Sequence, residues 1–282
     1  MMYKVLKNKK LNDNSYLMVV EAPFVVKKCL PGQFVIVMSS EDSERIPLTI
    51  YDFDREKNLV YLIYQVVGAS TLELSMVKDS LFSIAGPLGN PNEICLEPEK
   101  YKDKRICYVA GGVGIAPVYP QVKYLKEHGI NVDVIYGARD ASLFLIRKEI
   151  EAVASKIRYA TDDGSFGTKG RVTDILEKYI NDYDIVVAIG PVIMMKSVCE
   201  LTKQYNIKTI VSMNPIMVDG SGMCGACRCM VDGKPKFACI HGPEFDGAKV
   251  DFDLVMKRLK TYSDIEKEKF EEMKKLLTKE EK

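Results

Sequence analysis

The sequence predicts a small β-barrel domain, then an α/β domain on a mainly parallel sheet, then a cysteine-rich loop and a C-terminal helix. Three observations predict this fold class. The first hundred residues are short apolar runs separated by turn residues, strand-like and helix-like runs alternate after Tyr101, and Cys224, Cys227, Cys229 and Cys239 lie close together. The expected boundaries are 1–99 for the barrel, 100–212 for the α/β domain, 213–250 for the loop and 251–282 for the helix.

Length and composition limit the class of protein. A chain of 282 residues is long enough for about two domains. Hydrophobic residues make up 47% and charged residues 28%, which excludes a disordered or fibrous chain, and the net charge of +1 does not favour nucleic acid or an anionic membrane. No apolar run approaches the roughly 18 residues that span a bilayer, and the N-terminus lacks the apolar stretch of a signal peptide. We therefore expect a cytoplasmic protein without nucleic-acid or membrane partners.

The predicted barrel strands are short runs rich in Val, Ile, Leu, Tyr and Phe. Pro, Gly, Asn, Asp or charged clusters separate them, and no helical pattern intervenes. Strands at this spacing are typical of a small barrel. The runs are residues 16–23, 33–40, 48–53, 59–66 and 80–87.

The second domain is predicted from the alternation of strands and helices. Such alternation indicates a mainly parallel sheet with crossover helices, whose ligands bind beyond the carboxyl ends of the strands. The expected strands are 105–112, 131–138, 157–163 and 184–190, and the expected helices are 115–129, 143–154, 172–182 and 191–205.

Two glycine turns indicate where a nucleotide binds. Gly111, Gly112 and Gly114 stand between a predicted strand and a helix, where glycine permits close backbone approach and a helix N-terminus favours a pyrophosphate. One such turn also serves as an ordinary strand-to-helix connection. Gly190 and Pro191 form a second turn at another strand end, and the two together favour a dinucleotide site.

The loop after the third predicted strand is polar. Asp162 and Asp163 follow this strand, and we assign Asp163 to the cofactor site, where it contacts a ribose or else only caps a turn. Arg139 follows the second strand and meets a 2′-phosphate or else only solvent. The choice between NADH and NADPH therefore stays open.

The cysteine spacing is the most specific motif in the chain. Cys224 and Cys227 form a C-x2-C pair, and Cys239 returns after a hairpin-like excursion through Asp232-Gly233. Plant-type [2Fe–2S] loops use C-x4-C-x2-C and a distant cysteine. Asp219 stands where the first sulfur would be, so the pattern D-x4-C-x2-C-x11-C predicts a cluster with one oxygen ligand.

Two other interpretations of the loop remain open from spacing alone. Cys224, Cys227, Cys239 and His241 match a structural zinc site of Cys3His type, and the cysteines could also lack a metal. Cys229 alternates away from Cys227, and we expect it to be a bystander, or a replacement ligand if Asp219 does not coordinate.

The motifs occur in an order that resembles a known family. The segments ERIPLTI, GAST, GPLGN and GGVGIAP and the cysteine loop follow one another over essentially the whole chain. This order resembles the ferredoxin–NADP reductase superfamily and, more narrowly, the electron-transfer subunits of dihydroorotate dehydrogenase. It is most similar to the small, alpha subunits of NADH-dependent reduced ferredoxin:NADP oxidoreductases, because Asp219 stands where dihydroorotate-type subunits have cysteine.

The resemblance implies an FAD site on the barrel. Thr49 is then the catalytic residue, with its hydroxyl near the flavin N5. The pattern departs from the superfamily because Arg45 comes one residue early, Leu48 replaces an aromatic residue, and Ile189 replaces a cysteine near the nicotinamide. The implied FAD positions are Ile46, Pro47, Leu48, Thr49, Ile63, Tyr64, Gln65, Gly68, Ser70 and Thr71.

The resemblance also implies an oxidoreductase subunit. Electrons would pass between NAD(H) or NADP(H), FAD and a [2Fe–2S] cluster held by Asp219, Cys224, Cys227 and Cys239. Because nothing else in the chain would bind a further centre, we expect a larger partner subunit with its own flavin and iron–sulfur clusters, and ferredoxin as a further partner. The alternatives are an electron-transfer subunit of a dihydroorotate dehydrogenase and a non-enzymatic module that binds nucleotide and zinc.

Overall fold

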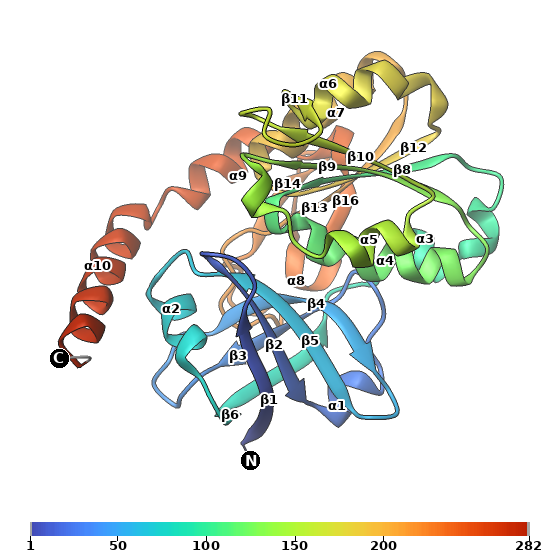
Figure 1. Cartoon of the computed structure of the whole chain (residues 1–282). Helices are drawn as coiled ribbons and strands as arrows, with labels where there is room; N and C mark the ends of the chain where they lie inside the picture. The colour runs from blue at the N-terminus through green and yellow to red at the C-terminus, as the bar shows by residue number, and fades with distance from the viewer. Residues whose placement is uncertain (1, 281–282) are drawn as a thin grey trace.

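Two seven-stranded sheets form the framework of the molecule (Figure 1). The computed structural model describes residues 2–280, so Met1 and residues 281–282 of the predicted first and last segments lie outside the described part. Within the described part, no helix combines the length and the apolar character needed to cross a membrane.

The first sheet is a nearly closed antiparallel barrel. Its strand order is β6-β1-β2-β5-β4-β3-β7. The edge strands β6 and β7 are consecutive in the chain, and Leu81 pairs with Tyr3 of β1 while Ser83 pairs with Met38 of β3. One stretch of chain therefore joins the two edges, as the sequence predicted. The strands are β1 (Tyr3–Lys10), β2 (Ser15–Glu21), β3 (Phe34–Met38), β4 (Ile46–Asp54), β5 (Leu59–Gln65), β6 (Ser80–Leu81) and β7 (Ser83–Leu88).

Strand β1 is not among the strands that the sequence predicts. Only Val5 of its residues is buried, and four of its eight residues are lysines, so it lacks the apolar run that marked the others. Residues Tyr3–Lys10 become a strand because their backbone pairs with β2. The short helices α1 (Pro23–Val26) and α2 (Ala69–Met76) complete this part of the chain.

The second sheet has the order β11-β10-β9-β8-β12-β13-β16. All its pairs are parallel except that of β13 with β16. The chain runs outward from β8 to β11 and then crosses back to β12 on the other side of β8, which creates a topological switch point between β8 and β12. The strands are β8 (Ile106–Gly111), β9 (Val132–Ala138), β10 (Lys156–Thr161), β11 (Thr168–Lys169), β12 (Ile185–Ile189), β13 (Lys208–Ser212) and β16 (Glu244–Asp246).

Helices cover both faces of this sheet (Figure 1). Helices α4 (Ile115–Glu127) and α5 (Arg147–Val153) share one apolar core with Tyr51 and Ile63 of the barrel. Helices α6 (Val172–Tyr179) and α7 (Val192–Gln204) form the core on the other face. Short helical segments connect the elements: α3 (Glu93–Leu96), η1 (Pro98–Tyr101), η2 (Gly112–Gly114), η3 (Ala141–Leu143) and η4 (Ile180–Asp182).

The helix expected over 143–154 is shorter than predicted. It begins at Arg147, because Ile146 has a left-handed backbone (φ 45°) and Phe144 packs edge-on against Tyr136 and Tyr159. Leu143 instead ends η3, and residues 144–146 connect that segment to α5.

The segment after β13 contains the cysteines and a small hairpin, β14 (Arg228–Val231) and β15 (Lys234–Phe237). Asp232 and Gly233 turn it with positive φ, as the sequence predicted. The short helices α8 (Ala238–His241) and η5 (Gly247–Lys249) follow. The predicted C-terminal helix is two helices, α9 (Phe252–Leu259) and α10 (Ser263–Glu280), and α10 projects past α2 (Figure 1).

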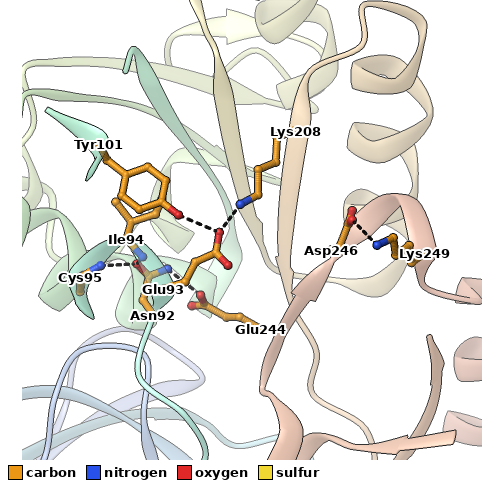
Figure 2. A network of polar contacts seen from close by, with 9 residues as sticks. All are labelled: Asn92, Glu93, Ile94, Cys95, Tyr101, Lys208, Glu244, Asp246 and Lys249. Atoms are coloured by element: carbon orange, nitrogen blue, oxygen red, sulfur yellow. Dashed lines mark hydrogen bonds and ion pairs between the residues drawn. The ribbon is translucent and has the colours of Figure 1, made fainter. Parts of the chain in front are cut away.

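The chain leaves the barrel beside the segment that follows the cysteine loop. The Asn90 backbone N–H donates to Gly242 O at 2.6 Å, and the Asn92 side-chain amide donates to the Glu244 carboxylate at 2.6 Å (Figure 2). Asn92 also accepts hydrogen bonds from the backbone of Ile94 and Cys95 at the start of α3. The barrel, the sheet and the cysteine segment thus meet at one polar junction.

Candidate functional site

The two glycine turns pack against each other at the switch point. A Cβ on Gly114 would stand 2.2 Å from Ile189 O, and one on Gly190 would stand 3.0 Å from Gly111 N. Pro191 is the residue before the first turn of α7 and would lie 2.9 Å from a Cβ on Gly111. Glycine is therefore required here for close packing of the carboxyl ends of β8 and β12.

Gly112 differs from the other glycines of these turns. Its φ is +55°, and a Cβ placed on it would meet nothing within 4 Å. This backbone faces open space directly before α4, which leaves its surface accessible to a phosphate group. The structure thus supplies the kind of cradle that a dinucleotide needs at this position.

The polar loop after β10 holds its own carboxylate. Asp163 accepts hydrogen bonds from the backbone N–H and the hydroxyl of Ser165, which lower the pKa of Asp163. This geometry caps a turn, and Asp163 is exposed. Arg139 is also exposed, at the carboxyl end of β9.

Strand alternation divides the FAD residues of β4 and β5 into two sets that lie on opposite faces of the sheet. Ile46, Leu48 and Tyr64 pack in the barrel core, so they can reach a cofactor only through their backbone. Pro47 and Thr49 of β4, and Ile63 and Gln65 of β5, alternate onto the opposite face, toward the α/β domain. Thr49 is half-buried on this face, two residues before Tyr51, which packs in the core shared with the α/β domain.

The start of α2 carries the third set of these residues. The Thr71 hydroxyl accepts hydrogen bonds from the backbone of Val67 and Gly68, and Ser70 donates to the Glu44 carboxylate. A Cβ on Gly68 would meet nothing within 4 Å, so the backbone before α2 is open. Thr71 builds the turn, while Gly68 and Ser70 present groups at its surface.

The four residues assigned to the cluster form two pairs. The Asp219 carboxylate accepts a hydrogen bond from the Cys224 backbone N–H at 3.2 Å and from Ser221 N–H at 2.7 Å. The sulfurs of Cys227 and Cys239 are 3.2 Å apart and buried, whereas Cys224 is exposed. Among residues 2–280, no three His, Cys, Asp or Glu side chains are arranged to hold a metal ion.

The electrostatics of the loop fit a cationic inorganic core. Burial, Cys227 and the charge of Asp219 raise the pKa of Cys239 to about 12. Donors of this kind, crowded together, oppose their own ionisation, and bound iron would reverse that effect because thiolates are its ligands. The thiol and carboxylate donors of this loop therefore suit an iron–sulfur cluster.

Two arginines hold the backbone of the loop. Arg45 donates from Nε to Val218 O at 2.9 Å and from Nη2 to Asp219 O at 3.1 Å. Arg258 of α9 donates to Ala226 O at 3.0 Å, next to Cys227. These contacts join residues far apart in the chain, so the sequence alone does not reveal the role of Arg45 or that of Arg258.

The remaining candidates have structural partners. Cys229 is buried in the apolar core, where desolvation raises its pKa to about 11. His241 accepts a hydrogen bond on Nδ1 from the Phe237 backbone at 3.0 Å.

Glu244 is a further group that sequence reasoning missed. Its carboxylate accepts hydrogen bonds from Asn92 and from the Gln121 side chain, the latter at 2.8 Å. Burial nevertheless raises the pKa of Glu244 to about 7. Within the described residues, the Gln121 Oε1 and Tyr108 hydroxyl are buried without a partner.

Two family models match the chain. Residues 214–251 match the iron–sulfur cluster binding domain of dihydroorotate dehydrogenase B. Residues 108–200 match the oxidoreductase NAD-binding domain. The first match favours iron–sulfur over zinc for the cysteine loop.

Curated relatives match over nearly their full length. A homologue of the dihydroorotate dehydrogenase B electron transfer subunit from Thermotoga maritima is 43% identical, over 95% of this chain and 94% of the relative. The dihydroorotate dehydrogenase B electron transfer subunit of Clostridium acetobutylicum is 34% identical, over 88% of this chain and 95% of the relative.

Solved structures give the same picture. A chain from the structure of an NADH-dependent reduced ferredoxin–NADP oxidoreductase, described in connection with flavin-based electron bifurcation, is 40% identical. It covers 96% of this chain and 98% of its own length with a TM-score of 0.89. The cytochrome b5 reductase domain of Ulva prolifera nitrate reductase, at 18% identity and a TM-score of 0.58 over 73% of this chain and 93% of its own, shares the fold alone.

Proposed function

The chain belongs to the family of dihydroorotate dehydrogenase B electron transfer subunits, and we propose that it serves as the small subunit of an NADH-dependent reduced ferredoxin:NADP oxidoreductase. It is a flavo-iron–sulfur oxidoreductase subunit. Its cofactors are FAD and a [2Fe–2S] cluster, and its substrate is NAD(H) or NADP(H).

One observation carries the choice within the family. The chain matches the ferredoxin–NADP oxidoreductase structure at 40% identity and a TM-score of 0.89 over almost the full length of both chains. Asp219 at the first ligand position supports the same choice, because the resemblance places a cysteine there in dihydroorotate-type subunits.

The side chains of this protein bind and orient, while FAD supplies the exchange between two-electron and one-electron chemistry that no side chain offers. Gly112 leaves its backbone open to the pyrophosphate of the dinucleotide, at the start of α4. Thr49 presents its hydroxyl on the barrel face toward the α/β domain, where it orients the flavin edge. Asp219, Cys224, Cys227 and Cys239 hold the cluster.

The partner follows from the family. Its members are electron transfer subunits, so a larger catalytic subunit accompanies them. We infer that the partner of this chain carries a second flavin and further iron–sulfur clusters, and that ferredoxin is a redox partner of the complex.

Anaerobic purification tests the proposal. We expect about one flavin, two irons and two sulfides per chain, with visible absorbance that NADH or NADPH bleaches, and a large iron–sulfur flavoprotein that co-purifies. Zinc in place of iron, or protein without flavin, would contradict the cofactor assignment.

The second candidate is a subunit of a dihydroorotate dehydrogenase, which the names of the curated relatives favour. The co-purifying partner separates the two functions. A partner that reduces this chain with dihydroorotate would establish the second candidate, and one that exchanges electrons with ferredoxin and a nicotinamide would establish the first.

A further inference from the structure

Two guanidinium groups reach the cluster loop from separate parts of the fold. Arg45 stands directly before Ile46, at the start of the barrel strand that carries Thr49, and it bonds the carbonyls of Val218 and Asp219. Arg258 lies on α9, beyond the loop, and bonds the carbonyl of Ala226. Both arginines are half-buried.

Each contact falls next to an assigned ligand. Arg45 binds the backbone of Asp219 itself, while the Asp219 side chain is fixed separately by the backbone of Ser221 and Cys224. Ala226 precedes Cys227, whose sulfur lies 3.2 Å from that of Cys239. Arginine is suited to this task because its rigid fork donates in fixed directions and stays charged.

The barrel side of the loop is also held by packing. Gly220 has a φ of +77°, and a Cβ on it would come within 2.7 Å of both Ile36 and Leu88 side chains. Gly220 therefore packs closely against β3 and β7. Arg45, from the same barrel, donates hydrogen bonds to the carbonyls of Val218 and Asp219. The loop cannot shift on this side without breaking both contacts.

The charges of the two arginines matter for the cluster. Three thiolates, one carboxylate and a [2Fe–2S] core with both irons ferric carry a total charge of about −2, and one added electron makes this about −3. A fixed cation stabilises the more negative form more strongly, so it favours reduction. Arg45 and Arg258 are two such cations, and both are half-buried and bonded to the loop backbone.

We propose that Arg45 and Arg258 are positioning residues that clamp the cluster loop from its two sides and raise the reduction potential of the cluster. The inference rests on the proposed function, since it takes Asp219, Cys224, Cys227 and Cys239 as ligands. Arg45 has the additional task of tying the loop to the strand assigned to the flavin, which keeps the two centres at a constant separation.

Redox titration of the anaerobic protein, followed by the EPR signal of the reduced cluster, tests the clamp. Arg45→Gln and Arg258→Gln should each lower the equilibrium constant for one-electron reduction about tenfold, which corresponds to about 59 mV. Arg45→Lys should stay within about threefold of the wild type, because the charge remains. The matched control is Arg228→Gln, which removes an exposed arginine of β14 that lies between Cys227 and Cys229.

The outcomes separate the clamp from the proposed function. Glutamine variants with full iron and flavin and an unchanged potential would overturn the clamp, as would an equal shift in Arg228→Gln. An Arg45→Lys variant whose potential shifts as far as that of Arg45→Gln would overturn the role given to the charge. If one glutamine variant fails to retain the cluster, the potential of the other decides. Wild-type protein without iron would instead contradict the proposed function itself.

Discussion

Glu244 makes the stability of the fold depend on pH. Burial raises its pKa from 4.5 to about 7 although its carboxylate accepts hydrogen bonds from Asn92 (Figure 2) and from Gln121. A raised folded-state pKa means that the folded protein binds the proton more tightly than the unfolded chain. Proton binding at Glu244 therefore stabilises the folded protein. This contribution to the free energy of unfolding is fully present below about pH 4.5 and is lost as the pH rises through 7. The shift corresponds to at most about 3 kcal/mol.

Glu244→Gln should remove this dependence. The new glutamine accepts from Asn92 through its oxygen. When the Gln121 amide turns over, its Oε1, which otherwise lacks a partner, accepts from the new N–H2, so the variant mimics the protonated acid. Urea denaturation at pH 4.5 and pH 8 gives the free energies of unfolding of the wild type and the variant. Between the two pH values, the stability of the variant relative to the wild type should increase by about 2–3 kcal/mol.

Glu177→Gln, on the exposed face of α6, is the matched control and should show no such change. A wild type and Glu244→Gln that differ by the same amount at both pH values would refute the reasoning. Glu93, Cys95 and Tyr108 are the other titratable groups coupled to this site, and all of them remain in the variant.

Three further predictions concern the cofactor sites. Gly114→Ala should lower the free energy of unfolding by about 3 kcal/mol and weaken NADH binding, because the new Cβ meets Ile189 O at 2.2 Å; Gly112→Ala, with open space around it, should cost only about 1 kcal/mol in urea denaturation. Asp219→Cys should change the EPR and visible spectra of the cluster, and unchanged spectra would mean that Asp219 is not a ligand. Thr49→Val should slow stopped-flow bleaching of the flavin by NADH about five- to tenfold with flavin content retained, since one hydrogen bond contributes about 1 kcal/mol, and an unchanged rate would exclude a role for the hydroxyl.

Much of the fold could be predicted because its core strands are marked by apolar runs. Strands β8 and β12 are buried along their whole length, so the sequence shows them as unbroken apolar segments. Strand β16 was missed because three residues between Pro243 and Gly247 carry no such signal, and pairing with β13 alone makes them a strand.

The candidate site was less accessible from sequence. Spacing predicted Asp219 and the cysteines as ligands because the ligands of such a cluster lie close together in the chain. The contacts of Arg45 with Val218 and Asp219 span more than 170 residues, and an arginine on a helix face such as Arg258 has the same pattern as a solvated one. Only the folded structure reveals long-range hydrogen bonds of this kind.

The pairing of β13 with β16 has a consequence for how the protein can be modified. Ser212 lies opposite Glu244, so the chain leaves the sheet and returns to it at adjacent positions. Residues 213–243 thus form an insertion between two adjacent antiparallel strands. Because Ser212 and Glu244 already lie side by side, a shorter connection between them costs little closure entropy. A ferredoxin-like loop of another spacing could therefore be grafted at the same two ends, and it would have to supply the apolar groups that Met213, Cys227 and Cys239 bury in the core.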